Sequence, residues 1–325
     1  MPDKQKKYTV LFVDDEPRIT SALKAIFRKE YNVLVANSGV KALSTLADNH
    51  VDVIVSDQRM PEMLGNELLS AVSKHYPQTM RILLTGFMDK QAIVDSINEG
   101  EIYRFINKPW NNDQMREVIA EAALASEIPV IDFVPSAQEA TQETAAPSPT
   151  KAAEAPAPSA DEEIGFIKDK AMLMIEKQKD IRHQIRKFCS KQEIMIYGTQ
   201  NAEQAIAAAT SRETIGVAIV ELSQDTSEAV QTINLLKQAR PELITIALTD
   251  EYDAHTAVDL INQGQVFKYL SKPLDINGFQ QTIQNAFLRH SFLKKNKEST
   301  KRYKVEKTKG ILSNLQNLFK RFANA

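Results

Sequence analysis

The chain contains a single cysteine and no long apolar run, and we expect no targeting segment. One cysteine, Cys189, excludes an internal disulfide and fits a reducing compartment. No segment reaches the roughly 20 consecutive apolar residues that a membrane-spanning helix needs. The apolar run near the N-terminus is too short for a signal peptide and ends in acidic residues. We therefore expect a cytoplasmic protein.

Common catalytic motifs are also missing. The five histidines have no metal-ligand spacing, and no Walker loop, G-x-S-x-G or H-E-x-x-H is present. The net charge of −2 indicates no class of partner, while 43% apolar and 25% charged residues are typical of a globular protein. At 325 residues the chain is long enough for two domains. We do not expect an enzyme.

What the sequence does contain is an alternation of strand-like and helix-like segments. Val51–Ser56 is rich in β-branched residues and fits a buried strand. Three further strands are predicted at Tyr8–Val13, Met80–Leu84 and Ile102–Ile106. Amphipathic segments separate or follow them: Arg18–Lys29, Val40–Asn49, Gly65–His75, Lys90–Asn98 and Asp113–Ala125. The alternation predicts a doubly wound parallel α/β sheet.

Polar residues follow the predicted strands at the point where each strand ends. They are Asp14 and Asp15, Asp57, Thr85, and Lys108. Ligand sites in parallel sheets lie at this edge, and the three carboxylates suit Mg²⁺. With the ion bound, Asp57 can attack a phosphoryl group, Lys108 can neutralise its oxygens and Thr85 can bond the new phosphate. Singly, each residue also fits a turn, and the acidic pair fits a helix cap.

Together, these residues resemble the receiver domain of response regulators, the phosphoacceptor module of two-component signalling. The resemblance covers residues 7–125 and rests on the acidic pair, D-x-x-M-P from Asp57 to Pro61, T-G and K-P. One departure is Leu64, where many receivers carry Asp, but this residue lies outside the phosphate pocket. The resemblance implies these roles: phosphoacceptor Asp57, catalytic partners Lys108 and Thr85, switch residues Thr85 and Phe105, and Mg²⁺ ligands Asp14, Asp15, Asp57 and the Arg59 backbone carbonyl.

The second half of the chain repeats the first. Adding 164 converts Asp57 to Glu221, Thr85 to Thr249, Phe105 to Tyr269 and Lys108 to Lys272. The segment GEIYRFINKP aligns without a gap on GQVFKYLSKP. We therefore predict two flavodoxin-like, five-stranded sheets in tandem. The predicted boundaries are 1–125 for the first domain, 126–163 for the linker, 164–290 for the second domain and 291–325 for the tail.

The second set of site residues is altered. Nearer the N-terminus the offset is 162, so Glu176 and Lys177 replace the acidic pair, while Thr249 and Lys272 persist. We predict that the Lys177 ammonium takes the place of the ion between Glu176 and Glu221, which disfavours Mg²⁺. The domain is then a pseudo-receiver with a fixed, constitutive docking role. Drift after duplication explains the lost chemistry equally well.

Two further regions have biased composition. Residues 126–163 hold six of the thirteen prolines and no glycine, which predicts a disordered, semi-extended linker. The tail is basic, and its apolar residues after Gly310 fall on one face of a predicted helix. Such a helix binds an anionic membrane surface, a partner groove or nucleic acid, or packs on its own domain or on a second copy.

We predict a response regulator that accepts a phosphoryl group on Asp57 from a histidine kinase or a histidine phosphotransfer protein. Its output is a contact of the pseudo-receiver and tail with a downstream protein. Homodimer formation is neither predicted nor excluded by the sequence, and nucleic acid is not an expected partner. Two alternatives remain: a transcriptional regulator that uses the basic tail to bind nucleic acid, and a phosphorylation-controlled regulator of a separate enzyme subunit.

Overall fold

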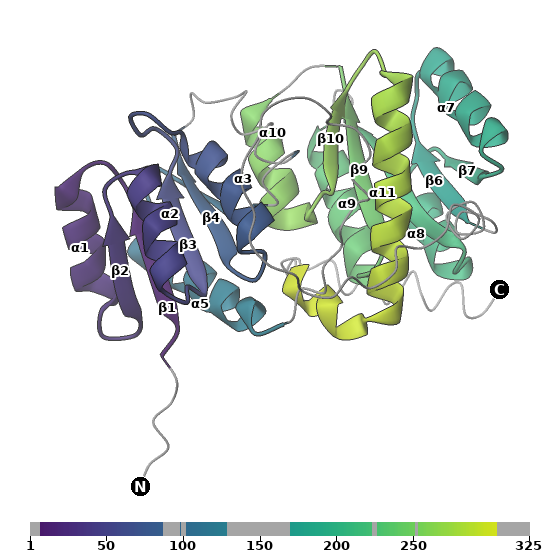
Figure 1. Ribbon diagram of the computed structural model, residues 1–325. Helices are drawn as coiled ribbons and strands as arrows, with labels where there is room; N and C mark the ends of the chain where they lie inside the picture. The colour runs from purple at the N-terminus through teal and green to yellow at the C-terminus, as the bar shows by residue number, and fades with distance from the viewer. Residues whose placement is uncertain are drawn as a thin grey trace, which may run out of the picture.

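The computed structural model describes residues 7–86, 98, 102–128, 170–222, 226–250 and 253–303. These residues form two α/β domains that lie side by side (Figure 1). The predicted linker after Ile128, most of the predicted helix before Asn98 and the tail after Tyr303 lie outside the described residues. No described helix is both long and apolar enough to cross a membrane.

The first domain has a five-stranded, wholly parallel sheet in the order β2-β1-β3-β4-β5. The strands are β1 (Thr9–Val13), β2 (Asn32–Ala36), β3 (Val53–Asp57), β4 (Met80–Thr85) and β5 (Arg104–Asn107). This order confirms the predicted doubly wound sheet. The sequence gives no residue range for β2, which lies at the sheet edge and has only two buried residues, Val33 and Ala36.

Helices cover both faces of this sheet. On one face Phe12 of β1 packs with Phe27 of α1 (Pro17–Phe27) and Met115 of α5 (Asn112–Ser126). On the other face Leu11 of β1 packs with Ala42 of α2 (Gly39–Asp48) and Leu68 of α3 (Gly65–His75). Because residues alternate in direction along β1, its two faces supply both apolar layers.

Polar side chains define where the helices begin. Ser38 Oγ accepts a hydrogen bond from the Lys41 N–H at the start of α2, and Asn111 Oδ1 accepts one from the Asp113 N–H at the start of α5. These oxygens satisfy N–H groups that have no partner within the helix. The caps fix the loops that follow β2 and β5, and therefore help to fix the strand ends.

The second domain repeats this arrangement. Its parallel sheet has the order β7-β6-β8-β9-β10, formed by β6 (Ala171–Ile175), β7 (Met195–Thr199), β8 (Ile215–Leu222), β9 (Ile244–Thr249) and β10 (Lys268–Ser271). One face packs on α7 (Lys179–Lys191) and α11 (Ile276–Lys295). The other packs on α8 (Ala202–Ser211), α9 (Thr226–Ala239), α10 (Ala254–Asp259) and the short π-helical segment η1 (Leu260–Gly264).

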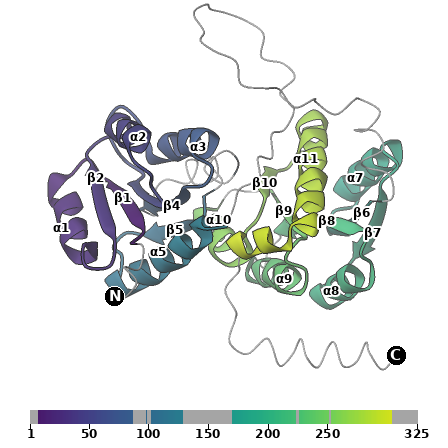
Figure 2. The ribbon, with the colours of Figure 1, turned by 60° about the horizontal axis from the view of Figure 1, so that its bottom comes forward.

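The predicted boundary at residue 290 falls inside α11. His290 and Leu293 are buried, so the helix continues as part of the second domain to Lys295. A 3-10 segment, η2 (Lys297–Tyr303), follows and contacts α5 of the first domain (Figure 2). The beginning of the predicted tail is therefore folded, because it still carries apolar residues that the domain buries.

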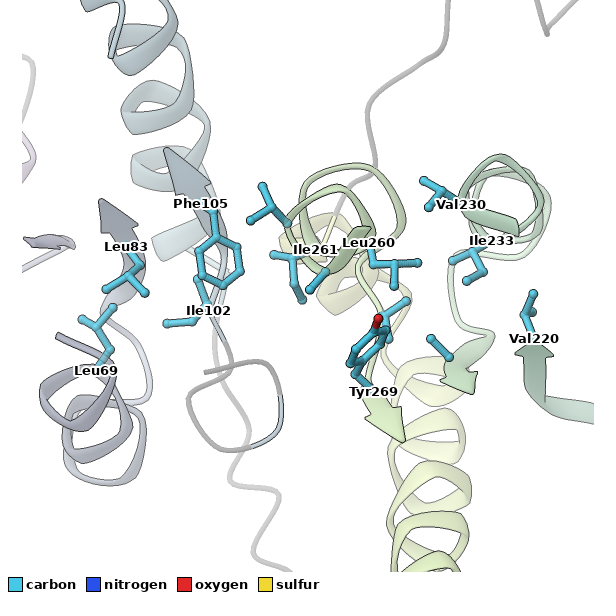
Figure 3. Packing of buried hydrophobic residues seen from close by; sticks show 14 of the residues in the cluster. Leu69, Leu83, Ile102, Phe105, Val220, Val230, Ile233, Leu260, Ile261 and Tyr269 are labelled. Atoms are coloured by element: carbon cyan, nitrogen blue, oxygen red, sulfur yellow. The ribbon is translucent and has the colours of Figure 1, made fainter. Parts of the chain in front are cut away.

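The two domains share an apolar cluster. Ile102 and Phe105 of the first domain lie opposite Ile261 of the second, while Leu260 beside it points into the second domain (Figure 3). All four side chains are at most 3% exposed. Burial of this kind stabilises an interface through the area removed from water.

Candidate functional site

Asp57 stands at the carboxyl end of β3, a strand in which every residue is buried. Its Oδ1 accepts a hydrogen bond from the Gln58 N–H at 2.8 Å and lies 2.7 Å from Lys108 Nζ. Among the described groups, no bond or ion pair is recorded for Oδ2, and the residue is 7% exposed. Oδ2 is therefore the oxygen best placed to react.

The acidic pair follows β1 and faces Asp57. Asp14 is 1% exposed, and its Oδ1 accepts a hydrogen bond from the Glu16 N–H at 2.9 Å. Its buried Oδ2 has no hydrogen-bond partner and lies 3.5 Å from Lys108 Nζ. Burial raises the pKa of Asp14, and the neighbouring Asp57 charge adds to the effect. The site thus holds a carboxylate whose negative charge is only partly compensated.

These residues fit a magnesium ion. Asp14, Asp15 and Asp57 each offer an oxygen, and the three oxygens lie within 4.8 Å of one another. In the part of the chain that the structure describes, this is the only such group of three. The unbonded Asp14 Oδ2 supplies a free ligand atom, and hard carboxylate oxygens are what Mg²⁺ prefers. Receiver domains generally bind Mg²⁺ in such an acidic site.

The other predicted residues lie around this site. Thr85 ends β4, is 1% exposed and donates its hydroxyl to the Gly86 carbonyl at 3.1 Å. Lys108 follows β5, and its N–H donates to the Thr85 carbonyl at 2.9 Å. Phe105 is buried in β5 two positions before the strand ends. The Arg59 side chain is exposed in the loop after β3, and the role of its carbonyl stays a prediction.

Gly65 contributes a close approach that we did not predict from the sequence. A Cβ atom on Gly65 would lie 2.1 Å from the carbonyl oxygen of Asp57. The Gly65 N–H also donates to the Gln58 carbonyl at 3.0 Å. The first turn of α3 can therefore pack directly on the strand end that carries Asp57, because residue 65 has no side chain.

The second site, at the corresponding strand ends, is built around one lysine. Lys272 Nζ lies 2.6 Å from Glu221 Oε1, 3.3 Å from Glu176 Oε2 and 3.5 Å from Asp250 Oδ2. Its side chain is 4% exposed, against 29% for Lys108 in the first site. The ammonium therefore sits where an ion would have to bind.

Our prediction for Lys177 was wrong. The residue is exposed, and it contributes only its backbone N–H, which donates to Glu221 Oε2 at 2.9 Å. The lysine follows β6 with its side chain turned to solvent, so Lys272 alone compensates the glutamates. Asp250, which we did not consider, is the third carboxylate at this site; it replaces Gly86 of the first domain by the same offset of 164.

In the second site one ammonium compensates the carboxylates in the place of a metal. Burial raises the pKa of Glu176, and the adjacent Glu221 charge raises it further. Burial also opposes ionisation of Glu221, but hydrogen bonds from Lys272 and the Lys177 N–H outweigh it and lower the pKa of Glu221. Glu221 and Lys272 thus form a buried ion pair, and Glu176, whose pKa is raised, lies beside it with its Oε2 3.3 Å from the same ammonium.

Comparison with known proteins gives a family match within the first domain. Residues 10–120 match the response regulator receiver domain family, and this segment is therefore a receiver domain of the two-component type. The matched segment contains the whole first site, from Asp14 to Lys108. The second sheet has the same strand order, but the family match does not extend to it.

Curated proteins are similar to this chain over somewhat more than a third of its length. "Hydrogenase transcriptional regulatory protein HoxA" of Cupriavidus necator is 39% identical over 125 residues, which are 38% of this chain and 26% of that protein. "Regulatory protein AtoC" of Escherichia coli is 32% identical over 114 residues, or 35% and 24% of the two chains. The chain thus spans about a quarter of the length of these relatives.

A solved signal receiver domain of an HD domain-containing protein from Pseudomonas fluorescens is 33% identical to this chain. The likeness covers 39% of this chain and 94% of that structure, with a TM-score of 0.37.

Proposed function

We propose that this chain is a response regulator in which Asp57 is the single phosphoacceptor. The observation that carries the proposal is the contrast between an acidic site with an unbonded carboxylate oxygen and a second site already filled by Lys272. The phosphoryl donor is a phosphohistidine on a histidine kinase or a phosphotransfer protein. The output is a protein contact rather than catalysis.

The residues of the first site divide the reaction between them. Asp57 Oδ2 attacks phosphorus, a P–O bond forms, the P–N bond to the donor imidazole breaks, and that imidazole nitrogen takes up a proton. Lys108 moves from Asp57 Oδ1 to the phosphoryl oxygens, and the Thr85 hydroxyl turns from the Gly86 carbonyl to the same group. Asp14 and Asp15 would hold a magnesium ion, which would supply positive charge to the transfer when bound.

The second domain is, in this proposal, a degenerate receiver. Its sheet order and its strand-end Glu176, Glu221 and Lys272 repeat the first domain, while the buried ion pair leaves no place for Mg²⁺. Phosphorylation is therefore confined to the first domain, and the second domain transmits the signal through its contacts.

Mass spectrometry after incubation with phosphoramidate and Mg²⁺ tests the assignment. We expect one phosphoryl group on the wild-type chain and on Glu221→Gln, and none on Asp57→Asn. The only tryptophan, Trp110, lies with its ring 5.8 Å from Lys108 Nζ, so its fluorescence should change when Lys108 moves to the phosphate. Unchanged phosphorylation in Asp57→Asn would refute the assignment.

A second candidate follows from the names of the relatives, two of which are regulatory proteins and one of which is named as transcriptional. The basic residues beyond Tyr303 would then bind nucleic acid. Such binding should weaken steeply as salt rises and disappear when residues 304–325 are removed. Binding that survives this truncation would assign the contact to another surface.

A further inference from the structure

Asn262 in η1 binds both backbone groups of Phe105, the switch residue of the first domain. Its Oδ1 accepts the Phe105 N–H at 2.9 Å, and its Nδ2 donates to the Phe105 carbonyl at 3.1 Å. β5 is an edge strand in the described sheet, and an edge leaves such groups open. One side-chain amide thus takes the place that a neighbouring strand would fill.

The reverse contact is also present. Asn98 Oδ1 accepts the Tyr269 N–H at 3.1 Å, and Asn98 Nδ2 donates to the Tyr269 carbonyl at 3.1 Å. Adding 164 to Asn98 and Phe105 gives Asn262 and Tyr269. The domains therefore exchange equivalent asparagines across a pseudo-twofold interface, which we call the asparagine clamp: these two asparagines and the two backbone segments they hold.

The clamp surrounds a tightly packed interface. Ile102 and Phe105 pack opposite Ile261 (Figure 3), and Gln265 Nε2 donates to the Tyr103 carbonyl at 3.0 Å. A buried backbone group that loses its hydrogen-bond partner raises the free energy of the folded protein. The two domain faces therefore favour contact with each other over contact with water. The reciprocal polar contacts and the apolar packing together identify the second domain as a specific partner.

We propose that the second domain is the partner that covers the β5 edge, and that phosphorylation of Asp57 breaks the two hydrogen bonds between Asn262 and the Phe105 backbone. This inference rests on the proposed function of Asp57. It adds what the phosphoryl group controls, namely whether the β5 face is covered by the second domain or open to another partner.

The site reaches the clamp through β4 and β5. Lys108 lies three residues after Phe105, and its N–H is bonded to the Thr85 carbonyl. When Lys108 and Thr85 turn toward a phosphoryl group, the carboxyl ends of β4 and β5 move. Phe105 of β5 is paired directly with Leu83 of β4, so this movement reaches Phe105. A two-point hydrogen bond at 2.9 and 3.1 Å weakens steeply with small shifts in distance and angle.

Contacts of η2 with the first domain hold the two domains together when the Asn262 hydrogen bonds break. Arg302 of η2 is 2% exposed and donates to the carbonyls of Ile128, Pro77 and Gln78 at 2.9, 2.8 and 3.1 Å. None of these acceptors lies on β5. Release at Phe105 should therefore open one side of the interface, while the Arg302 side keeps the domains together.

Hydrogen exchange in the full chain tests this inference. After phosphoramidate and Mg²⁺, a short labelling pulse should show the Phe105 N–H exchanging at least about tenfold faster, as expected when its bond to Asn262 is lost. Asn262→Ala should show the fast exchange without phosphorylation and little further change with it. Asn296→Ala removes a side-chain amide bond to the Phe292 carbonyl at the C-terminal end of α11 and should leave Phe105 exchange as in the wild type.

The outcomes separate the two proposals. Phosphorylated Asp57 with unchanged Phe105 exchange would overturn the clamp release and leave the proposed function intact. Slow Phe105 exchange in Asn262→Ala would also overturn it, because the clamp would then not protect this strand. Absence of phosphorylation, seen as no mass change, would remove the proposed function and the inference together.

Discussion

The two strand-end sites of this chain contain similar groups in the same topological positions, yet they differ in how the lysine is held. Lys108 is 29% exposed and contacts Asp57 and Asp14, whereas Lys272 is 4% exposed between Glu221 and Glu176. Each glutamate is one methylene longer than the aspartate it replaces. The longer side chains enclose the ammonium, and a site that can receive an ion becomes a closed ion pair.

The two domains also differ in a helix residue at equivalent sequence positions near each site. Gly65 lets α3 pack against the Asp57 carbonyl, and the equivalent position in α9 is Ala229, by the offset of 164. A Cβ atom is not tolerated beside the Asp57 carbonyl, whereas the sequence counterpart of Gly65 carries one. The first domain therefore keeps its reactive carboxylate next to a close backbone approach that needs glycine.

The largest expected effect is on the buried lysine. Lys272→Ala leaves Glu221 and Glu176 without their cation and should lower the free energy of unfolding of the second domain by about 3–5 kcal/mol. Cys189 is buried in the core of that domain, and burial raises its pKa to about 11. Its rate of labelling by a thiol reagent therefore measures the opening of the second domain.

Lys108→Ala is the matched variant. Its side chain is more exposed, so its removal should destabilise the first domain by no more than about 1 kcal/mol, as for partly solvated pairs. If Lys272→Ala does not fold, the double variant Glu221→Gln with Lys272→Met should fold, because it leaves no unpaired ionised partner at these two positions. Equal losses for the two lysines would contradict the contrast between an open and a closed site.

The next effect concerns Gly65. In Gly65→Ala the new methyl group must displace the Asp57 backbone, which should cost about 1–3 kcal/mol and reduce phosphorylation of Asp57. Ala229→Gly, its counterpart, should cost about 1 kcal/mol through backbone entropy alone. Urea unfolding followed by Trp110 fluorescence measures the first domain. A Gly65→Ala protein with normal stability and phosphorylation would show that the close approach relaxes freely.

The strand-end chemistry was predictable because the carboxyl ends of parallel strands converge on one edge. Asp14, Asp57, Thr85 and Lys108 could therefore be brought together from their spacing alone. The direction of a side chain after a strand depends on the loop that follows, and this is why the role of Lys177 was predicted wrongly. The spacing of residues along the sequence does not show in which direction such a side chain points.

The interface was not predictable for a related reason. Asn98 and Asn262 are ordinary helix-surface residues in the amino-acid pattern, and their partners are backbone groups about 160–170 residues away in the chain. Backbone acceptors leave no mark in the sequence. The internal repeat did place both asparagines in equivalent positions, but only the structure shows that they exchange.

The smallest expected effect is the response of the first site to Mg²⁺ and pH. At tenfold excess over its dissociation constant, Mg²⁺ should stabilise the first domain by about 1.4 kcal/mol, measured as a higher thermal midpoint by Trp110 fluorescence.

Burial raises the pKa of Asp14, so without metal the folded site holds this proton to a higher pH than the unfolded chain does. That contribution to stability is present at low pH and is lost as pH rises through the folded-state pKa. Mg²⁺ needs the ionised carboxylate, so its stabilising effect should grow over the same range and fade on acidification. Asp14→Asn should abolish the Mg²⁺ response, whereas Glu176→Gln should leave it unchanged. A response that survives in Asp14→Asn, or that Glu176→Gln removes, would place the ion in the second domain and reverse the comparison.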